Sequence, residues 1–245
     1  MKVIVCGASG RVGKYLTKAV LEDQDMELIA GIVSGVSPHK GKPIEGSHIV
    51  YSDCIIHFLG DCDLIIDFSS PKATNGLLDL IKGRDIALVL GTTAMDEFLQ
   101  IKIDRISADA AVLQGANFAH GFEAYLKSVL DIAQRHRPVS ATVREVYHKN
   151  KKKAPSGTSV RIAKEVSETL HGVCGGALPE VPVEVVRDGD TVGINSVRLN
   201  LGASKIDIAF TVHTLEAYAK GALEAGHWLV KKPAGLYVLK DMILS

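Results

Sequence analysis

The sequence has no excess of charge of either sign. Its 245 residues carry 28 Lys or Arg and 28 Asp or Glu, so the formal net charge is zero. A neutral chain lacks the long-range attraction that draws proteins to nucleic acid or to anionic membranes. We therefore expect neither a nucleic acid nor a membrane among its partners.

Metal, disulfide and membrane signals are also missing. No two of the four cysteines have Cys-x-x-Cys spacing, and the histidines form no ligand-spaced cluster, so no metal site is predicted. Scattered thiols are typical of the reducing cytoplasm. No window approaches the roughly 18 apolar residues of a membrane span, and no secretory leader precedes the first apolar run. These features predict a soluble cytoplasmic protein.

What the first half does contain is a regular alternation of apolar runs and helical patterns. Short runs that end near glycine read as buried parallel strands, and apolar residues at helical spacing separate them. This alternation predicts an α/β fold with a Rossmann-type doubly wound parallel sheet over about the first 115 residues. The expected strands are 3–6, 28–33, 64–68, 86–90 and 111–113.

The second half has a different pattern. Helical spacing marks 120–134, 158–170 and 215–230, while β-like runs cover 139–147, 181–187, 193–201 and 205–213. In the last run Ile206, Ile208, Phe210 and Val212 occupy every second position, as in a strand with one buried face. We expect a second, α+β domain with an open mixed or antiparallel sheet.

A glycine-rich loop joins the first strand to the first helix. It reads Gly7, Ala8, Ser9, Gly10, Arg11, Val12 and Gly13. Glycines at this point allow a tight turn and close approach of the backbone to a pyrophosphate, and the helix start offers free N–H groups. The loop predicts dinucleotide binding, with an ordinary tight strand-to-helix turn as the alternative.

Other strand ends bear on the identity of the cofactor. The second strand ends at Ser34 without the carboxylate that usually holds the ribose of NAD, which favours NADPH or the use of both cofactors; the alternative is that Ser34 is only a turn residue. Ligands of open α/β sheets bind at the carboxyl ends of strands. Two further loops at such ends could border the nicotinamide, namely Gly91, Thr92 and Thr93, and Ala116, Asn117 and Phe118.

The most distinctive segment combines a strand end, a cationic loop and a helix start. Tyr147, His148 and Lys151 come first, and Ser156, Gly157 and Thr158 follow Pro155. A helix N-terminus with small residues and nearby lysines suits a carboxylate. The segment predicts a site for a small dianion, unless it is a solvated lysine run followed by a plain helix cap.

With these motifs the sequence resembles the dihydrodipicolinate reductase family over nearly its whole length. The resemblance rests on the glycine loop and five other segments: Asp67-Phe68-Ser69-Ser70-Pro71, Gly91-Thr92-Thr93, Ala116-Asn117-Phe118, Lys151 with Ala154-Pro155-Ser156-Gly157-Thr158, and Gly235-Leu236-Tyr237 before Asp241. It implies reduction of 4-hydroxy-tetrahydrodipicolinate by NADPH or NADH in lysine and diaminopimelate biosynthesis. It also implies a homotetramer. Residues 1–118 and 215–245 would bind the dinucleotide, and residues 119–214 would bind substrate and mediate oligomerisation.

The resemblance also implies roles for individual residues. Phe68 would join the loops described above in binding the cofactor. Gly157 and Thr158, next to Ser156, would hold a substrate carboxylate. His148 would bind substrate, and Lys151 would be both a substrate contact and the cationic acid.

The sequence departs from the family pattern at the catalytic segment. Tyr147 stands where the family usually has its proton-donating histidine, Lys153 replaces an acidic residue, and the usual His and Ser-Arg features before the last long helix are absent. Tyr147 could act as the acid with help from Lys151, or it could only pack or position substrate while water, Lys151 or His148 supplies the proton. A reductase with a shifted small dicarboxylic substrate, or a nucleotide-binding homologue without hydride transfer, therefore stays open.

Overall fold

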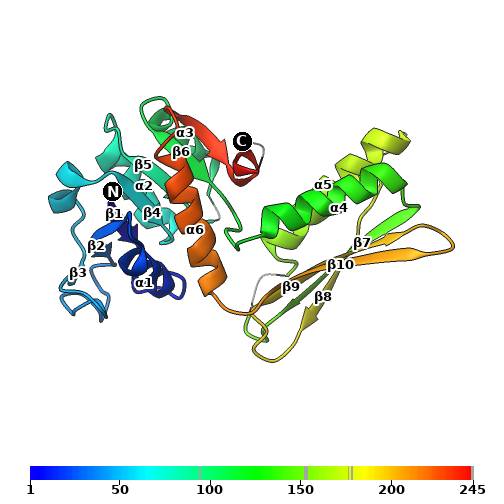
Figure 1. The fold of residues 1–245 in the computed structure, drawn as a ribbon, viewed down its shortest axis with the longest axis horizontal. Helices are drawn as coiled ribbons and strands as arrows, with labels where there is room; N and C mark the ends of the chain where they lie inside the picture. The colour runs from blue at the N-terminus through cyan, green and yellow to red at the C-terminus, as the bar shows by residue number, and fades with distance from the viewer. Residues whose placement is uncertain (94, 152–153, 176, 178, 244–245) are drawn as a thin grey trace. The chain divides into compact units, whose positions relative to one another are not determined.

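The chain folds into two compact units in a computed structural model that describes residues 1–93, 95–151, 154–175, 177 and 179–243. The first unit combines Met1–His120 with Leu215–Ser245, and the second is Gly121–Thr214 (Figure 1). Among the described residues, no helix is both long enough and apolar enough to cross a membrane.

The first unit is built on a parallel sheet with the strand order β3-β2-β1-β4-β5-β6-β11. Chain order runs outward in both directions from the β1–β4 pair, which confirms the expected doubly wound sheet. The topological switch point therefore lies at the carboxyl ends of β1 and β4. The strands are β1 (Lys2–Cys6), β2 (Glu27–Ile32), β3 (Tyr51–Ser52), β4 (Leu64–Asp67), β5 (Ala87–Leu90), β6 (Ala111–Gln114) and β11 (Gly235–Val238).

Helices cover both faces of this sheet because successive side chains of a strand point to opposite faces. Val3 and Val5 pack in a core with α1 (Gly13–Glu22) and α6 (Glu216–Leu229). Their neighbour Ile4 packs in a second core with α2 (Pro71–Ile81) and α3 (Glu97–Ile106). Figure 1 shows α6 alongside α1. Two short 3-10 helices, η1 (Ile56–Asp61) and η2 (Leu239–Met242), complete the unit.

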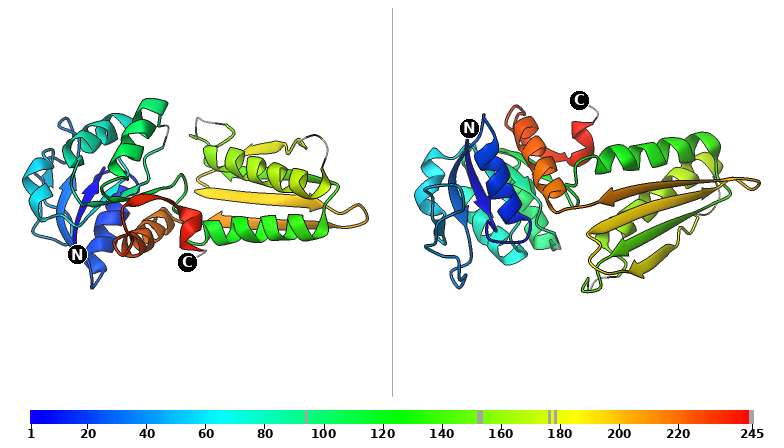
Figure 2. Two further views of the ribbon diagram at one scale, coloured as in Figure 1. Left: turned by 90° about the horizontal axis from the view of Figure 1, so that it is seen from above. Right: turned by 60° about the horizontal axis from the view of Figure 1, so that its bottom comes forward.

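The second unit is a four-stranded sheet with the order β10-β9-β7-β8. β9 runs antiparallel to β7 and β10, whereas β8 runs parallel to β7, so the sheet is mixed, as expected. The strands are β7 (Ser140–Tyr147), β8 (Val183–Arg187), β9 (Gly193–Asn200) and β10 (Lys205–Val212). Figure 2 shows α4 (Phe122–His136) and α5 (Gly157–Cys174) along one face of this sheet.

Candidate functional site

The glycine loop after β1 takes a shape that other residues cannot adopt. Gly7 has a φ of +76°, and the N–H groups of Gly7 and Ala8 both donate to the carbonyl of Ile32. A Cβ on Gly13 would lie 2.0 Å from the carbonyl oxygen of Gly7, and a Cβ on Gly10 would lie 2.9 Å from it. The loop is therefore folded tightly on itself, and it brings backbone rather than side chains to the start of α1.

A cavity of about 530 Å³ opens at the carboxyl ends of β1, β2 and β4. Of the predicted cofactor residues, Gly7, Ser9, Gly10, Ser34 and Phe68 line it. Ala8 is buried beneath the loop, while Arg11 is exposed and Val12 half-buried just before α1 begins. The volume falls in the range of small-molecule sites, and the position is the switch point where such sheets bind ligands.

The Ser69 hydroxyl provides a test of whether the cavity suits a polar ligand. Ser69 lines the cavity, and its buried Oγ has no hydrogen-bond partner among the described residues. The Ser69 side chain lies close to the buried carboxyl of Asp67 and helps to lower the pKa of that carboxyl. Burial raises the same pKa by more, so the net pKa of Asp67 is raised. A buried hydroxyl without a partner is costly, so a ligand that bonds to Ser69 would fit here.

The loops after β5 and β6 meet the end of β4. A Cβ on Gly91 would fall 2.3 Å from the Phe68 ring, and that ring lies edge-on to Phe118 with centroids 5.3 Å apart. The buried Thr92 accepts a hydrogen bond at Oγ1 from the N–H of Ser69, at 3.1 Å. Three strand ends are therefore locked together beside the cavity.

Of the remaining predicted cofactor residues in these loops, one is buried and shapes its loop, and two are exposed. Asn117 is buried, and its Oδ1 accepts a bond from the N–H of Ala119 at 3.0 Å, so this side chain shapes its own loop. Thr93 and Ala116 are exposed at the carboxyl edge of the sheet, where they are accessible to a ligand.

In the second unit, the predicted carboxylate site lies at the start of α5. Ser156 caps the helix, since its Oγ accepts a bond from the N–H of Ser159 at 3.2 Å. Gly157 is exposed and Thr158 half-buried in the first turn. The first N–H groups of a helix have no partners within it, so this turn can receive an anion.

Glu145, on β7, holds this helix start in place. The side chain is completely buried, and its Oε2 accepts bonds from the N–H of Ser156 at 2.8 Å and from Ser159 Oγ at 2.6 Å. Its Oε1 accepts a bond from Arg187 Nη1 at 2.9 Å. Burial raises the pKa of Glu145, but the bonds from Ser156, Ser159 and Arg187 outweigh it and the net pKa is lowered. The carboxylate therefore stays ionised and ties α5 to the sheet.

Tyr147 lies two residues after Glu145 on β7 and belongs to the same hydrogen-bond network. Its side chain is buried, and its hydroxyl donates to Asn195 Oδ1 at 3.0 Å. Asn195 in turn donates from Nδ2 to Ser159 Oγ at 2.8 Å. Burial, together with the nearby Glu145 carboxylate, raises the pKa of Tyr147 despite bonds from Ser156 and Thr158. A phenol in this setting holds its proton tightly.

Lys151 lies over the face of the Tyr147 ring. Its Nζ is 3.6 Å from the ring centroid, and its N–H donates to the carbonyl of His148, which forms a turn after β7. Gly193 faces the Tyr147 ring and leaves space for it, since a Cβ at this position would lie only 2.7 Å from Tyr147 Cε1. His148 is half-buried beside this turn, and Lys153 lies outside the described residues. Tyr147, His148 and Lys151 are thus brought together beside the start of α5.

From the sequence alone, no role is assigned to Glu145, Arg187 or Asn195. One signal was available, because Glu145 occupies the buried face of an alternating strand between Val143 and Tyr147. A carboxylate on a buried face needs partners, which marks it as part of a network. Its partners themselves could not be identified without the pairing of β7 with β8 and β9.

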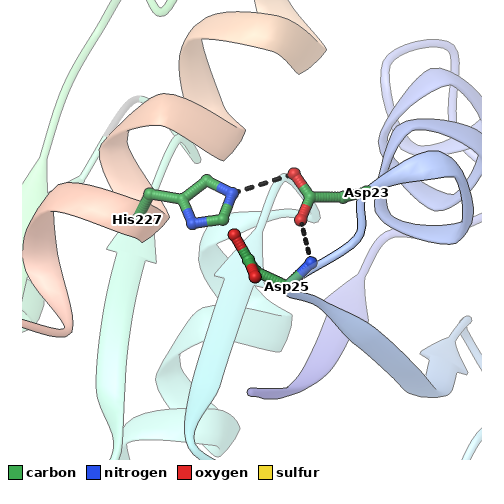
Figure 3. Close-up of side chains that lie close together, drawn as sticks. All are labelled: Asp23, Asp25 and His227. Atoms are coloured by element: carbon green, nitrogen blue, oxygen red, sulfur yellow. Dashed lines mark hydrogen bonds and ion pairs between the residues drawn. The ribbon is translucent and has the colours of Figure 1, made fainter.

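One further cluster of ionisable residues lies in the first unit, outside the residues that line the cavity. Asp23 and Asp25 follow the end of α1, and His227 lies on α6 (Figure 3). Their potential ligand atoms lie within 4.8 Å of one another. Because Asp23 and His227 are 204 positions apart in the chain, the sequence did not indicate this cluster. His227 Nε2 is 2.8 Å from Asp23 Oδ2. We interpret this contact as a hydrogen bond that joins the end of α1 to α6.

Comparison with known proteins accounts for both units. A family model described as "Dihydrodipicolinate reductase, N-terminus" matches residues 1–118, and one described as "Dihydrodipicolinate reductase, C-terminus" matches residues 121–243. The 4-hydroxy-tetrahydrodipicolinate reductase of Aquifex aeolicus is 30% identical, covering 99% of this chain and 98% of that protein. The enzyme of the same name from Methanoregula boonei is also 30% identical, with 99% and 97% covered.

Solved structures share the fold at lower sequence identity. A dipicolinate-bound dihydrodipicolinate reductase from Paenisporosarcina sp. TG-14 has a TM-score of 0.82 at 17% identity, covering 98% of both chains. An amine dehydrogenase from Mycobacterium smegmatis has a TM-score of 0.67 at 11% identity, covering 98% of this chain and 95% of that one. At such identities the likeness concerns architecture.

Proposed function

The chain belongs to the dihydrodipicolinate reductase family, and from this premise we propose that it reduces 4-hydroxy-tetrahydrodipicolinate to tetrahydrodipicolinate. The hydride donor is NADH or NADPH, and the reaction serves lysine and diaminopimelate biosynthesis in the cytoplasm. One observation carries the proposal: the buried Glu145 carboxylate fixes the start of α5 beside Lys151, as a dicarboxylate site requires.

The first unit binds the dinucleotide in this proposal. Gly7 and Gly10 allow the backbone to approach the pyrophosphate closely, the start of α1 offers it N–H groups, and the exposed Arg11 adds positive charge. Ser69 supplies a buried hydroxyl, and Phe68 with Thr93 borders the nicotinamide end. When bound, the reduced nicotinamide supplies the hydride. We assign this role to residues 1–118 and 215–245, and substrate binding and assembly to 119–214.

The second unit binds the substrate through its two carboxylates. The N–H groups of Gly157 and Thr158, together with the Thr158 hydroxyl, receive one carboxylate at the helix start. Lys151 and His148 contact the rest of the ring. Because Ser156 is occupied with Glu145 and Ser159, its part is to hold the turn rather than to bind directly.

Lys151 is the proton donor that this geometry favours. The 4-hydroxyl group of the substrate leaves as water, and hydride addition to one carbon leaves a neighbouring site that must take up one proton. The Tyr147 hydroxyl already donates to Asn195, is buried and has a raised pKa, so it is poorly placed to release a proton. The Lys151 ammonium is held over the Tyr147 ring, so the tyrosine positions the lysine through a cation–π contact.

Turnover of matched variants tests this assignment. The purified chain should oxidise NADH or NADPH when supplied with freshly made product of the upstream synthase. Lys151→Met should lower kcat by a factor of about 10² or more, the range for loss of a general acid. Lys149→Met, an exposed lysine of the same loop, is the control and should stay close to wild type.

Tyr147→Phe separates the two candidate acids. It keeps the aromatic ring under Lys151 and removes only the hydroxyl, so activity within about tenfold of wild type supports Lys151 as donor. A loss as large as that of Lys151→Met would instead identify Tyr147 as the acid. Tight cofactor binding without turnover in the wild type would indicate a nucleotide-binding homologue.

A shifted substrate is the second candidate function. The observation that favours it is the Tyr147–Asn195 pair, which places a phenol and an amide where the family usually has its catalytic histidine. A related imino or keto diacid reduced with a higher kcat/KM than 4-hydroxy-tetrahydrodipicolinate would establish this alternative.

Assembly as a homotetramer completes the proposal. In the second unit, α4 and α5 lie along one face of the sheet, and the opposite face carries Thr142, Arg198 and Asp207. That face is a surface through which copies of the chain can pair. Light scattering on the purified protein measures the mass, and a monomeric mass at working concentration would refute this part.

A further inference from the structure

A carboxylate lies beside the cavity at a point where the sequence indicated none. Strand β2 ends at Ile32 and continues through Val33, Ser34 and Gly35, so no acidic residue stands at its tip. Strand β3 runs parallel to β2, with Ser52 paired to Ile32. The residue that follows β3 therefore arrives at the same edge of the sheet, and that residue is Asp53.

Asp53 faces the cavity across Gly35. A Cβ on Gly35 would lie 3.4 Å from Asp53 Oδ2, in ordinary contact, so the carboxylate borders the space left by the missing side chain. Both residues line the 530 Å³ cavity, together with Ser34 and the Gly7–Gly10 loop. In a doubly wound sheet the tip of the second strand is where the adenosine ribose lies when the glycine loop holds the pyrophosphate.

Lys40 holds this carboxylate from the side. Its Nζ is 2.6 Å from Asp53 Oδ2, and this hydrogen bond lowers the pKa of Asp53. The segment that carries Lys40 is itself anchored, because His39 packs edge-on against Tyr51 with ring centroids 5.7 Å apart and the N–H of Gly41 donates to the carbonyl of Tyr51. The carboxylate is therefore ionised and fixed in direction.

We infer that Asp53, positioned by Lys40, accepts the hydroxyls of the adenosine ribose and makes this protein select NADH over NADPH. The inference rests on the proposed function and reverses the preference for NADPH that the lack of an acid after Ile32 suggests. A carboxylate accepts two hydrogen bonds from a ribose with free hydroxyls, and it repels a 2′-phosphate in the same place. Lys40 is engaged by Asp53, so its charge is offset rather than offered to a phosphate.

Direct binding of the two cofactors tests the inference without any substrate. Titration of the wild type with NADH and with NADPH, followed by the fluorescence of the reduced nicotinamide, gives two dissociation constants. We expect NADH to bind at least about tenfold more tightly, the effect of one charge-assisted hydrogen bond. Asp53→Asn should bring the ratio of the two constants close to one, mainly by weakening NADH.

Two further variants separate a specific role from a structural one. Asp61→Asn removes an exposed carboxylate at the end of η1 and should leave the ratio unchanged. Lys40→Gln should lower the preference for NADH, Lys40→Arg should restore it, and Lys40→Gln added to Asp53→Asn should have no further effect. This pattern identifies Lys40 as a positioning residue that acts through Asp53.

Two results would overturn the inference while leaving the proposed function intact. The first is a wild type that binds NADPH more tightly and loses that preference in Lys40→Gln, because the lysine would then be the phosphate ligand. The second is an Asp53→Asn ratio equal to that of the wild type. Failure of the wild type to bind either cofactor would instead refute the proposed reductase function, and this inference with it.

Discussion

Replacement of Glu145 by glutamine is the sharpest test of how the fold supports the substrate site. All three groups that bond to the Glu145 carboxylate are donors, namely the N–H of Ser156, the hydroxyl of Ser159 and the guanidinium of Arg187. Glutamine keeps the size of the side chain but turns one oxygen into an NH2 group. Whichever way the amide is turned, that NH2 group faces at least one donor.

The expected cost follows from these bonds. Loss of one hydrogen bond to a charged group costs about 1.5–3 kcal/mol, and a buried donor left facing another donor adds about 1–3 kcal/mol. Removal of one partner of a buried ion pair costs about 3–5 kcal/mol. Because Arg187 stays partly exposed and can be rehydrated, we expect Glu145→Gln to lower the free energy of unfolding of the second unit by about 3 kcal/mol.

Urea unfolding followed by far-ultraviolet circular dichroism measures this loss. The chain has a single tryptophan, Trp228, on α6 of the first unit, so its fluorescence reports on the other unit in the same sample. Glu184→Gln is the matched control, since Glu184 is exposed on β8 and undergoes the same chemical change. A Glu145→Gln variant within about 0.5 kcal/mol of this control would refute the reasoning.

The same variant has a defined pH dependence. The pKa of Glu145 is lowered in the folded state, so the stabilisation is complete above the unfolded value of about 4.3 and is lost as the pH falls through the folded value. The stability gap between wild type and Glu145→Gln should therefore close in acid. A gap that persists unchanged well below pH 4 would mean that the charge of Glu145 is not what the network uses.

Two other perturbations concern the first unit. Gly13→Ala should weaken NADH binding at least about tenfold, because its Cβ would lie 2.0 Å from the Gly7 oxygen; Gly172→Ala, with open space around it in α5, should leave binding unchanged and add about 0.5–1 kcal/mol of stability. Asp23→Asn should cost about 0.5–1 kcal/mol at neutral pH. Because the hydrogen bonds to Asp23 from His227 and from the backbone together outweigh burial and lower its pKa, thermal unfolding should show that difference shrinking as the pH falls below about 4.

Local patterns made most of the fold predictable from the sequence. The run 3–6 became β1 (Lys2–Cys6), and the alternation in 205–213 became β10 (Lys205–Val212). Helix α3 (Glu97–Ile106) was missed although Leu99, Ile103 and Ile106 carry the right spacing. Strands β3 and β11 were missed for a physical reason: each is at most four residues long and exists only through pairing with a distant partner.

The candidate sites divide in the same way. The glycine loop and the cap at Ser156 are local features, and both were predicted. The Glu145 network was not, because its partners lie 11, 14 and 42 residues away, two at the start of α5 and one on the paired strand β8. Asp53 was overlooked for the same reason, since it reaches the tip of β2 only through the parallel neighbour β3.

The first unit is discontinuous, and this affects how the protein is made. Synthesis on the ribosome produces β1 to β6 first, then the whole of Gly121–Thr214, and only then α6 and β11. Until those last segments emerge, the growing chain has six strands of this sheet, one face that is covered by α1 but not yet by α6, and an unpaired edge at β6. Both features invite association with other nascent chains. The inserted unit Gly121–Thr214 is synthesised completely before α6 and β11, so it can fold first. The segment Met1–His120 must be protected from association until the inserted unit and these last elements have been synthesised.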